Sequence, residues 1–110
     1  MGLHAVVGAM SAASTPAGDL LRRAADIVEG ARRTSYGQPE RAFNTIAAYW
    51  TIYLQQRGAL PADRIIRPED VARMMELLKI GRGNGEDDCL DAAGYAALAY
   101  EVRGEMEGRA

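Results

Sequence analysis

The sequence predicts an all-α fold, a four-helix bundle. Apolar residues recur at three- and four-residue steps, proline and glycine stand at the expected helix boundaries, and no stretch alternates apolar and polar residues as a strand would. The 110 residues fit one domain. We expect residues 1–15 to form a flexible tail and residues 16–110 a single helical domain. Because so short a chain buries a thin core, we also expect assembly into a dimer or tetramer.

The first two helices are placed by breaker residues. The first is predicted to begin near Asp19, after the cluster of residues 15–18, and to end around residues 32–33. A turn containing Gly37 follows, and the second helix is predicted from about Pro39 to Gln56. Its apolar stripe includes Trp50, which we assign to the core.

The third helix is predicted to open at Pro68, and its expected buried side consists of Val71, Met74, Met75, Leu77 and Leu78. Residues 81–85, rich in glycine, are predicted to leave the helix as a mobile flap. They do not form a phosphate-binding P-loop, because the required lysine and the preceding strand are missing. The fourth helix is predicted to start within residues 86–88 and to fray after Gly104.

Composition excludes several partners. The chain has 13 basic and 15 acidic residues, a net charge of −2, which argues against the basic face that nucleic-acid binding needs. No apolar run approaches the roughly 20 residues of a membrane span. The single cysteine, Cys89, permits no intrachain disulfide, and the first residues lack the basic start of a signal peptide. We therefore expect a cytoplasmic protein that binds neither membrane nor nucleic acid.

Several carboxylates stand on or beside apolar helix faces. Asp70 shares a face with Met74, and Asp91 shares one with Tyr95. Converging buried acids are costly unless a cation lies between them. Oxygen ligands without a histidine cluster suit Mg²⁺ or Mn²⁺. The predicted metal ligands are Asp70, Asp87, Asp88, Asp91 and Glu69.

The four aspartates each have a simpler interpretation. Asp70 could be only a favourable charge at a helix N-terminus, and Asp87 and Asp88 could be only caps of the fourth helix. For Asp91, which lies inside a helix, the alternative is a salt bridge to Lys79 or Arg82.

The acids resemble those of the all-α nucleoside triphosphate pyrophosphatases, the superfamily of MazG and the dimeric dUTPases. Its pattern is E-x-x-E on one helix and E-x-x-D on a later one. Residues 88–91, Asp-Cys-Leu-Asp, resemble the second half, and Asp70 suits the last acid of the first. The chain departs from the pattern at Arg67, three residues before Asp70, where the family has an acid.

A second resemblance, to small phage-type MazG-like proteins, covers residues 19–102. The shared positions are Arg32, Tyr36-Gly37, Pro39, Asn44, Trp50, Pro68-Glu69-Asp70-Val71-Ala72, Lys79-Ile80, Arg82, Asp87, Asp91 and Gly94-Tyr95-Ala96-Ala97. The resemblance implies a homo-oligomer that uses two or more Mg²⁺ or Mn²⁺ ions to cut a nucleoside triphosphate into monophosphate and pyrophosphate. The motifs are also similar to those of a dGTP-preferring member, so dGTP and GTP are expected substrates.

We assign roles on this basis. The expected catalytic residues are Asp70, Asp91 and Lys79. The expected substrate-binding residues are Asn44, Arg32, Tyr36, Lys79, Arg82 and Tyr95. Each has an ordinary alternative: helix-end charge for the cations, a solvated position for Asn44, and core or turn packing for the tyrosines. The rival function is a non-enzymatic helical adaptor that dimerises through its apolar faces; it leaves Asp91 unexplained.

Overall fold

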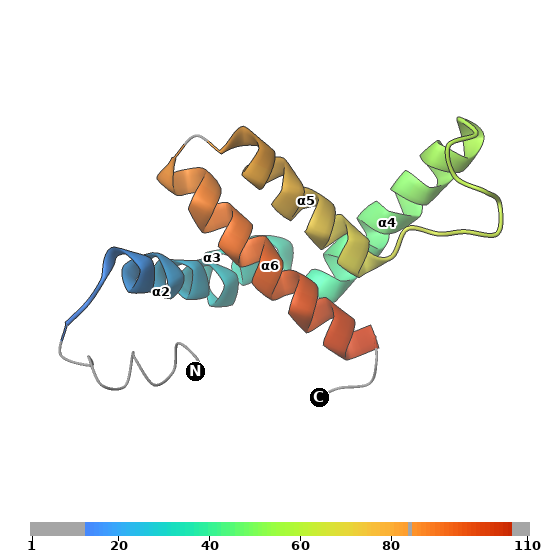
Figure 1. Ribbon diagram of the computed structural model, residues 1–110. Coiled ribbons are helices and arrows are strands. Elements are labelled where there is room, and N and C mark those ends of the chain that lie inside the picture. Colours follow the sequence, from blue (N-terminus) through green and yellow to red (C-terminus); the bar gives the residue numbers. More distant parts are fainter. Residues whose placement is uncertain (1–12, 84, 107–110) are drawn as a thin grey trace.

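The computed structural model describes residues 13–83 and 85–106, and the side chains of residues 31, 36, 105 and 106 are outside that description. Within this part of the chain all regular structure is helical, which confirms the all-α prediction (Figure 1). The helices are α2 (Pro16–Glu29), α3 (Ala31–Tyr36), α4 (Pro39–Gln56), α5 (Pro68–Arg82) and α6 (Glu86–Met106). Of the expected tail, residues 1–12 lie outside the described residues.

The first helix begins earlier than predicted and is interrupted. Helix α2 starts at Pro16, and the Thr15 hydroxyl, not Asp19, caps it by accepting a 2.9 Å hydrogen bond from the Gly18 N–H. Proline suits a first helical position because its missing N–H would have no partner there. At Gly30 (φ −110°, ψ −92°) the backbone leaves the helical region. The predicted single helix is therefore the two segments α2 and α3.

The other boundaries follow proline and glycine closely. Helix α4 has the predicted bounds, and α5 opens at Pro68 as predicted. Helix α5 continues through Arg82, so Gly81 and Arg82 are helical rather than part of the expected flap. It ends at Gly83, whose left-handed backbone conformation (φ 52°) is unstrained only for glycine. Residue 84 of the expected flap lies outside the described residues.

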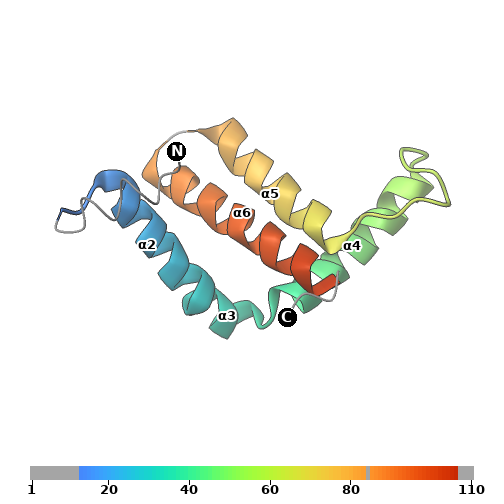
Figure 2. The ribbon, with the colours of Figure 1, turned by 60° about the horizontal axis from the view of Figure 1, so that its bottom comes forward.

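Helix α6 is the centre of the arrangement. It packs against α5 along one side and against α2 along the other, while α2 and α5 do not pack on each other (Figures 1 and 2). Helix α4 crosses the end of the α5–α6 pair and extends away from it. The radius of gyration, 16.6 Å, exceeds the roughly 13 Å of a compact chain of this size. A single chain therefore forms an open assembly of helices and not a closed bundle.

The core lies where α4, α5 and α6 meet. Its buried members are Phe43, Ala47, Val71, Ala72, Leu98, Ala99 and Val102. Trp50 packs against this cluster, as assigned. The prediction that Met74, Leu77 and Leu78 are buried is wrong. All three are exposed, because none of the described helices covers them. Among the described residues, no helix combines the length and apolarity needed to cross a membrane.

Candidate functional site

Four charged residues meet where the end of α5 faces the beginning of α6. Lys79 Nζ lies 3.1 Å from Asp91 Oδ2, and Arg82 Nε lies 3.4 Å from Asp88 Oδ1. We call Lys79, Arg82, Asp88 and Asp91 the polar cluster. The salt bridge that was the alternative interpretation of Asp91 is therefore present.

The local sequence explains this pairing. Lys79 and Arg82 are three residues apart, as are Asp88 and Asp91, so each pair projects from one helix face. The short connection after Gly83 makes α5 and α6 antiparallel neighbours and sets the two faces opposite each other. The cations stand in the last turn of α5 and the acids near the first turn of α6, where the helix dipoles favour them.

Burial differs across the polar cluster. The side chain of Asp88 is 7% exposed and that of Lys79 16%, whereas those of Asp91 and Arg82 are 42% and 56% exposed. A charge as buried as Asp88 needs a compensating charge. The Asp91 carboxylate is partly open to water, so it can also meet a ligand.

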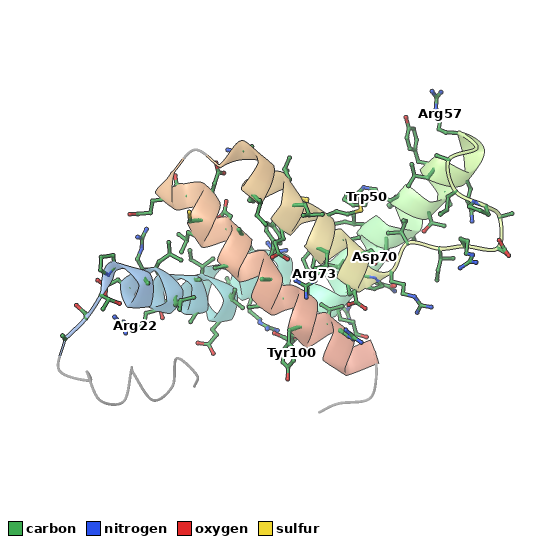
Figure 3. All side chains as sticks on the ribbon, in the orientation of Figure 1. Arg22, Trp50, Arg57, Asp70, Arg73 and Tyr100 are labelled. Atoms are coloured by element: carbon green, nitrogen blue, oxygen red, sulfur yellow. The ribbon has the colours of Figure 1, made fainter. Side chains whose placement is uncertain are left out.

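Asp70 lies elsewhere in the chain. Figure 3 shows it at the start of α5. Its Oδ2 accepts a 2.8 Å hydrogen bond from the Arg67 N–H. It stands nine residues before Lys79, about 14 Å along the helix at 1.5 Å per residue. Glu69 belongs to the same first turn. The structure thus does not bring Asp70 and Glu69 to the acids of α6 within one chain.

Asp87 is close to the polar cluster. It is exposed in the first turn of α6 and lines, with Arg82 and Asp88, a shallow hollow beside the α5–α6 connection. Cys89, also exposed, follows Asp88 on the next position of the helix.

An apolar pocket adjoins the polar cluster. It lies between α2, α3 and α6 and has a cavity volume of about 90 Å³. Its lining consists of Ala24, Ile27, Val28, Arg32, Leu90, Asp91, Gly94, Tyr95 and Leu98. We call it the interhelical pocket. Asp91 belongs to both the pocket and the polar cluster, so the two form one continuous surface.

Arg32 and Tyr95 line the interhelical pocket together, and the buried Phe43 ring contacts Arg32. The Arg32 guanidinium carbon is 5.1 Å from the centre of the Phe43 ring and 5.2 Å from that of the Tyr95 ring. The ring centroids are 6.5 Å apart at an angle of 44°. Cation–π contact of this kind holds a guanidinium in a fixed orientation. Arg32 and Tyr95 are therefore brought together as substrate-binding candidates.

Phe43 is a site residue that the sequence analysis missed. Its place in the apolar stripe of α4 explains its burial, but nothing in the spacing indicates that it supports Arg32. Asn44, its neighbour, is exposed on α4 and does not line the interhelical pocket. The side chain of Tyr36, a third candidate, lies outside the described residues.

The donor set can be tested against the expected metal ions. Within the described ranges, no three His, Cys, Asp or Glu side chains are grouped to hold one ion. The polar cluster has two cations and two carboxylates, so its charges already balance. This arrangement does not fit a resident pair of divalent ions in the single chain.

Comparison with known proteins places the chain among phage proteins. It is 39% identical over 88 residues to the Gene 55 protein of Mycobacterium phage L5, covering 76% of this chain and 52% of that protein. It is 33% identical over 94 residues to the Gene 55 protein of Mycobacterium phage D29, covering 81% and 57%. The chain spans about half the length of these curated relatives.

The comparison with solved structures gives no match. Residues 19–103 match the family described as "Domain of unknown function (DUF6378)", and this span includes the polar cluster and the interhelical pocket. The chain therefore belongs to the DUF6378 family.

Proposed function

We propose that the chain is a nucleotide pyrophosphohydrolase. It binds a nucleoside or deoxynucleoside triphosphate, with dGTP and GTP as first candidates, and releases the monophosphate and pyrophosphate. The observation that carries the proposal is the continuity of the interhelical pocket with the polar cluster through Asp91. The resemblance of the motifs to MazG-like pyrophosphatases supports the same reaction.

The interhelical pocket suits a nucleobase. Its walls are mainly aliphatic, and its polar side chains are few, as in small-molecule sites. The Tyr95 ring and the Arg32 guanidinium offer flat surfaces against which a base can stack.

The polar cluster suits the triphosphate. Lys79 and Arg82 project from one face of α5, and ammonium and guanidinium groups are strong phosphate ligands. Because the cluster is charge-balanced, the substrate is the Mg²⁺ or Mn²⁺ complex of the nucleotide, which brings its own ion.

In this reaction the partly exposed Asp91 acts as general base. Its carboxylate accepts a proton from a water molecule whose oxygen attacks the α-phosphorus. The bond from that phosphorus to the bridging oxygen breaks, and pyrophosphate leaves. Lys79 and Arg82 stabilise the negative charge that develops on the phosphate oxygens.

A substrate panel tests the reaction. The eight common ribo- and deoxyribonucleoside triphosphates are incubated with the full chain and Mn²⁺ or Mg²⁺, and monophosphate and pyrophosphate are quantified. We expect equal amounts of both products from at least one nucleotide. Release of neither product from any nucleotide would overturn the proposal.

Asp91→Asn tests the assigned base. We expect activity to fall about 100-fold or more, because the amide cannot accept the proton, while circular dichroism shows unchanged helix content. Asp63→Asn, in the exposed connector between α4 and α5, is the matched control and should retain full activity. Near wild-type activity of Asp91→Asn would remove Asp91 from the reaction.

The second candidate is a helical adaptor. Exposed apolar side chains on α4 and α5, among them Tyr53 and Leu77, favour docking to another protein surface. Thermal melting with a nonhydrolysable nucleotide and Mn²⁺ separates the two functions. A nucleotide-binding enzyme melts at a higher temperature with the ligand, and an adaptor does not.

A further inference from the structure

The polar cluster is arranged like a metal site between two helices, except that two of its four side chains are cations. Two helices face each other, each carries two charged residues three positions apart, and each residue of α5 pairs with one of α6. We propose that Lys79 and Arg82 stand in place of a divalent cation between α5 and α6. The free protein then holds no divalent ion at Asp88 and Asp91, and an ion enters there only together with a phosphate-bearing ligand.

Distances support the exclusion of a free ion. Lys79 Nζ lies 3.1 Å from Asp91 Oδ2, and Arg82 Nε lies 3.4 Å from Asp88 Oδ1. Divalent ions bind carboxylate oxygens at about 2.0–2.6 Å, so an ion on these oxygens would compete for the space that the ammonium and guanidinium groups occupy.

The charges of the polar cluster also support the exclusion of a free divalent ion. An entering Mg²⁺ or Mn²⁺ would find four side chains whose charges sum to zero and would lie beside two cations. Like charges within about 4–6 Å strongly disfavour one another. The effect is greatest at Asp88, whose side chain is only 7% exposed, because buried charges are screened least.

A bound phosphate group changes which groups the two cations pair with. It offers Lys79 and Arg82 negatively charged oxygens, which compete with the two carboxylates for them. Each cation that turns to the phosphate uncovers a carboxylate oxygen for the accompanying ion. Phosphate and metal then strengthen each other's binding, and this coupling is reciprocal. The coupled binding of phosphate and metal rests on the proposed function, whereas the exclusion of the free ion does not.

Mn²⁺ binding without any nucleotide tests the exclusion. The free ion is followed by electron paramagnetic resonance during titration of the full chain. We expect Lys79→Gln/Arg82→Gln to bind Mn²⁺ at least about tenfold more tightly than wild type, because two neighbouring positive charges are removed. Arg73→Gln is the matched control, since Arg73 pairs with Glu76 on α5 away from the cluster, and it should bind as wild type does.

Two results would overturn the proposal. One is wild-type affinity for Mn²⁺ equal to that of the double variant. The other is a gain that persists when Asp88→Asn/Asp91→Asn is added to the double variant, because the ion would then bind elsewhere. Arg82→Gln alone, at a side chain 56% exposed, gives a second comparison that does not depend on the double variant folding; it should show a smaller gain, and no gain counts against the proposal.

Melting curves test the coupling. We expect no rise in melting temperature with Mn²⁺ alone and a clear rise with Mn²⁺ plus a nonhydrolysable nucleoside triphosphate. An equal rise with Mn²⁺ alone would overturn the proposal. If the substrate panel fails while Lys79→Gln/Arg82→Gln gains Mn²⁺ affinity, the proposed function falls and the exclusion stands.

Discussion

Among single residues, Asp70 differs most from what its sequence position suggests. In the sequence Asp70 stands on an apolar helix face and fits a metal-ligand pattern. In the structure its carboxylate accepts a hydrogen bond from the Arg67 N–H at the start of its own helix. The residue three positions after a helix cap often reaches back in this way. The alternative stated from the sequence, a charge at a helix N-terminus, therefore agrees with where the structure has Asp70, and the structure adds a capping hydrogen bond.

We predict that Asp70→Ala lowers the free energy of unfolding by about 1 kcal/mol, since a cap interaction is lost. Urea denaturation followed by circular dichroism measures the change. A variant with unchanged stability and no pyrophosphate release would contradict the capping role and return Asp70 to the reaction.

How much of the site the sequence could predict also depends on single residues. The spacing identified Asp88 and Asp91, and it offered Lys79 and Arg82 as partners. It could not choose between metal and salt bridge, because that depends on the register of α5 against α6. Phe43 was missed for a related reason: its contact with Arg32 joins residues of two helices whose packing no local pattern specifies.

At the scale of the helices, the boundary at Gly30 is the clearest departure from prediction. A methyl group added there would lie 2.9 Å from the Asp26 carbonyl oxygen, which is too close. Periodicity passes through this position without a break, so the sequence predicts one helix. The boundaries expected at Pro39 and Pro68 are confirmed, whereas Gly81, where the flap was expected to begin, is helical.

We predict that Gly30→Ala lowers the free energy of unfolding by about 1 kcal/mol or more, because the backbone must shift to relieve the contact. Gly81→Ala is the matched control: its added methyl meets nothing within 4 Å, and in the helical turn it should stabilise by about 0.5–1 kcal/mol. Thermal and urea denaturation measure both. Equal effects of the same sign would contradict the structural explanation.

For the molecule as a whole, the open arrangement leaves apolar surface uncovered. Tyr49, Ile52 and Tyr53 on α4 and Leu77 and Leu78 on α5 are all exposed. The sequence identified the α5 stripe correctly as apolar, but periodicity does not say what covers a stripe. A second copy of the chain would supply that cover and complete the bundle that one chain leaves open.

We therefore predict that light scattering gives a mass two or four times that of the 11.9 kDa chain. Leu77→Glu should shift the chain toward the monomer, since it places a charge in the apolar contact. Gln56→Glu, exposed at the end of α4, is the control with an added charge outside the stripe. A monomer at every concentration would contradict the prediction.

The position of Cys89 has a practical consequence. It is the single cysteine of the chain, it is exposed, and it directly follows Asp88 in the first turns of α6. A fluorophore or spin label attached to its thiol needs no prior removal of other cysteines. The native sequence thus already provides a reporter beside the paired charges, on which ligand arrival can be followed as a change in signal.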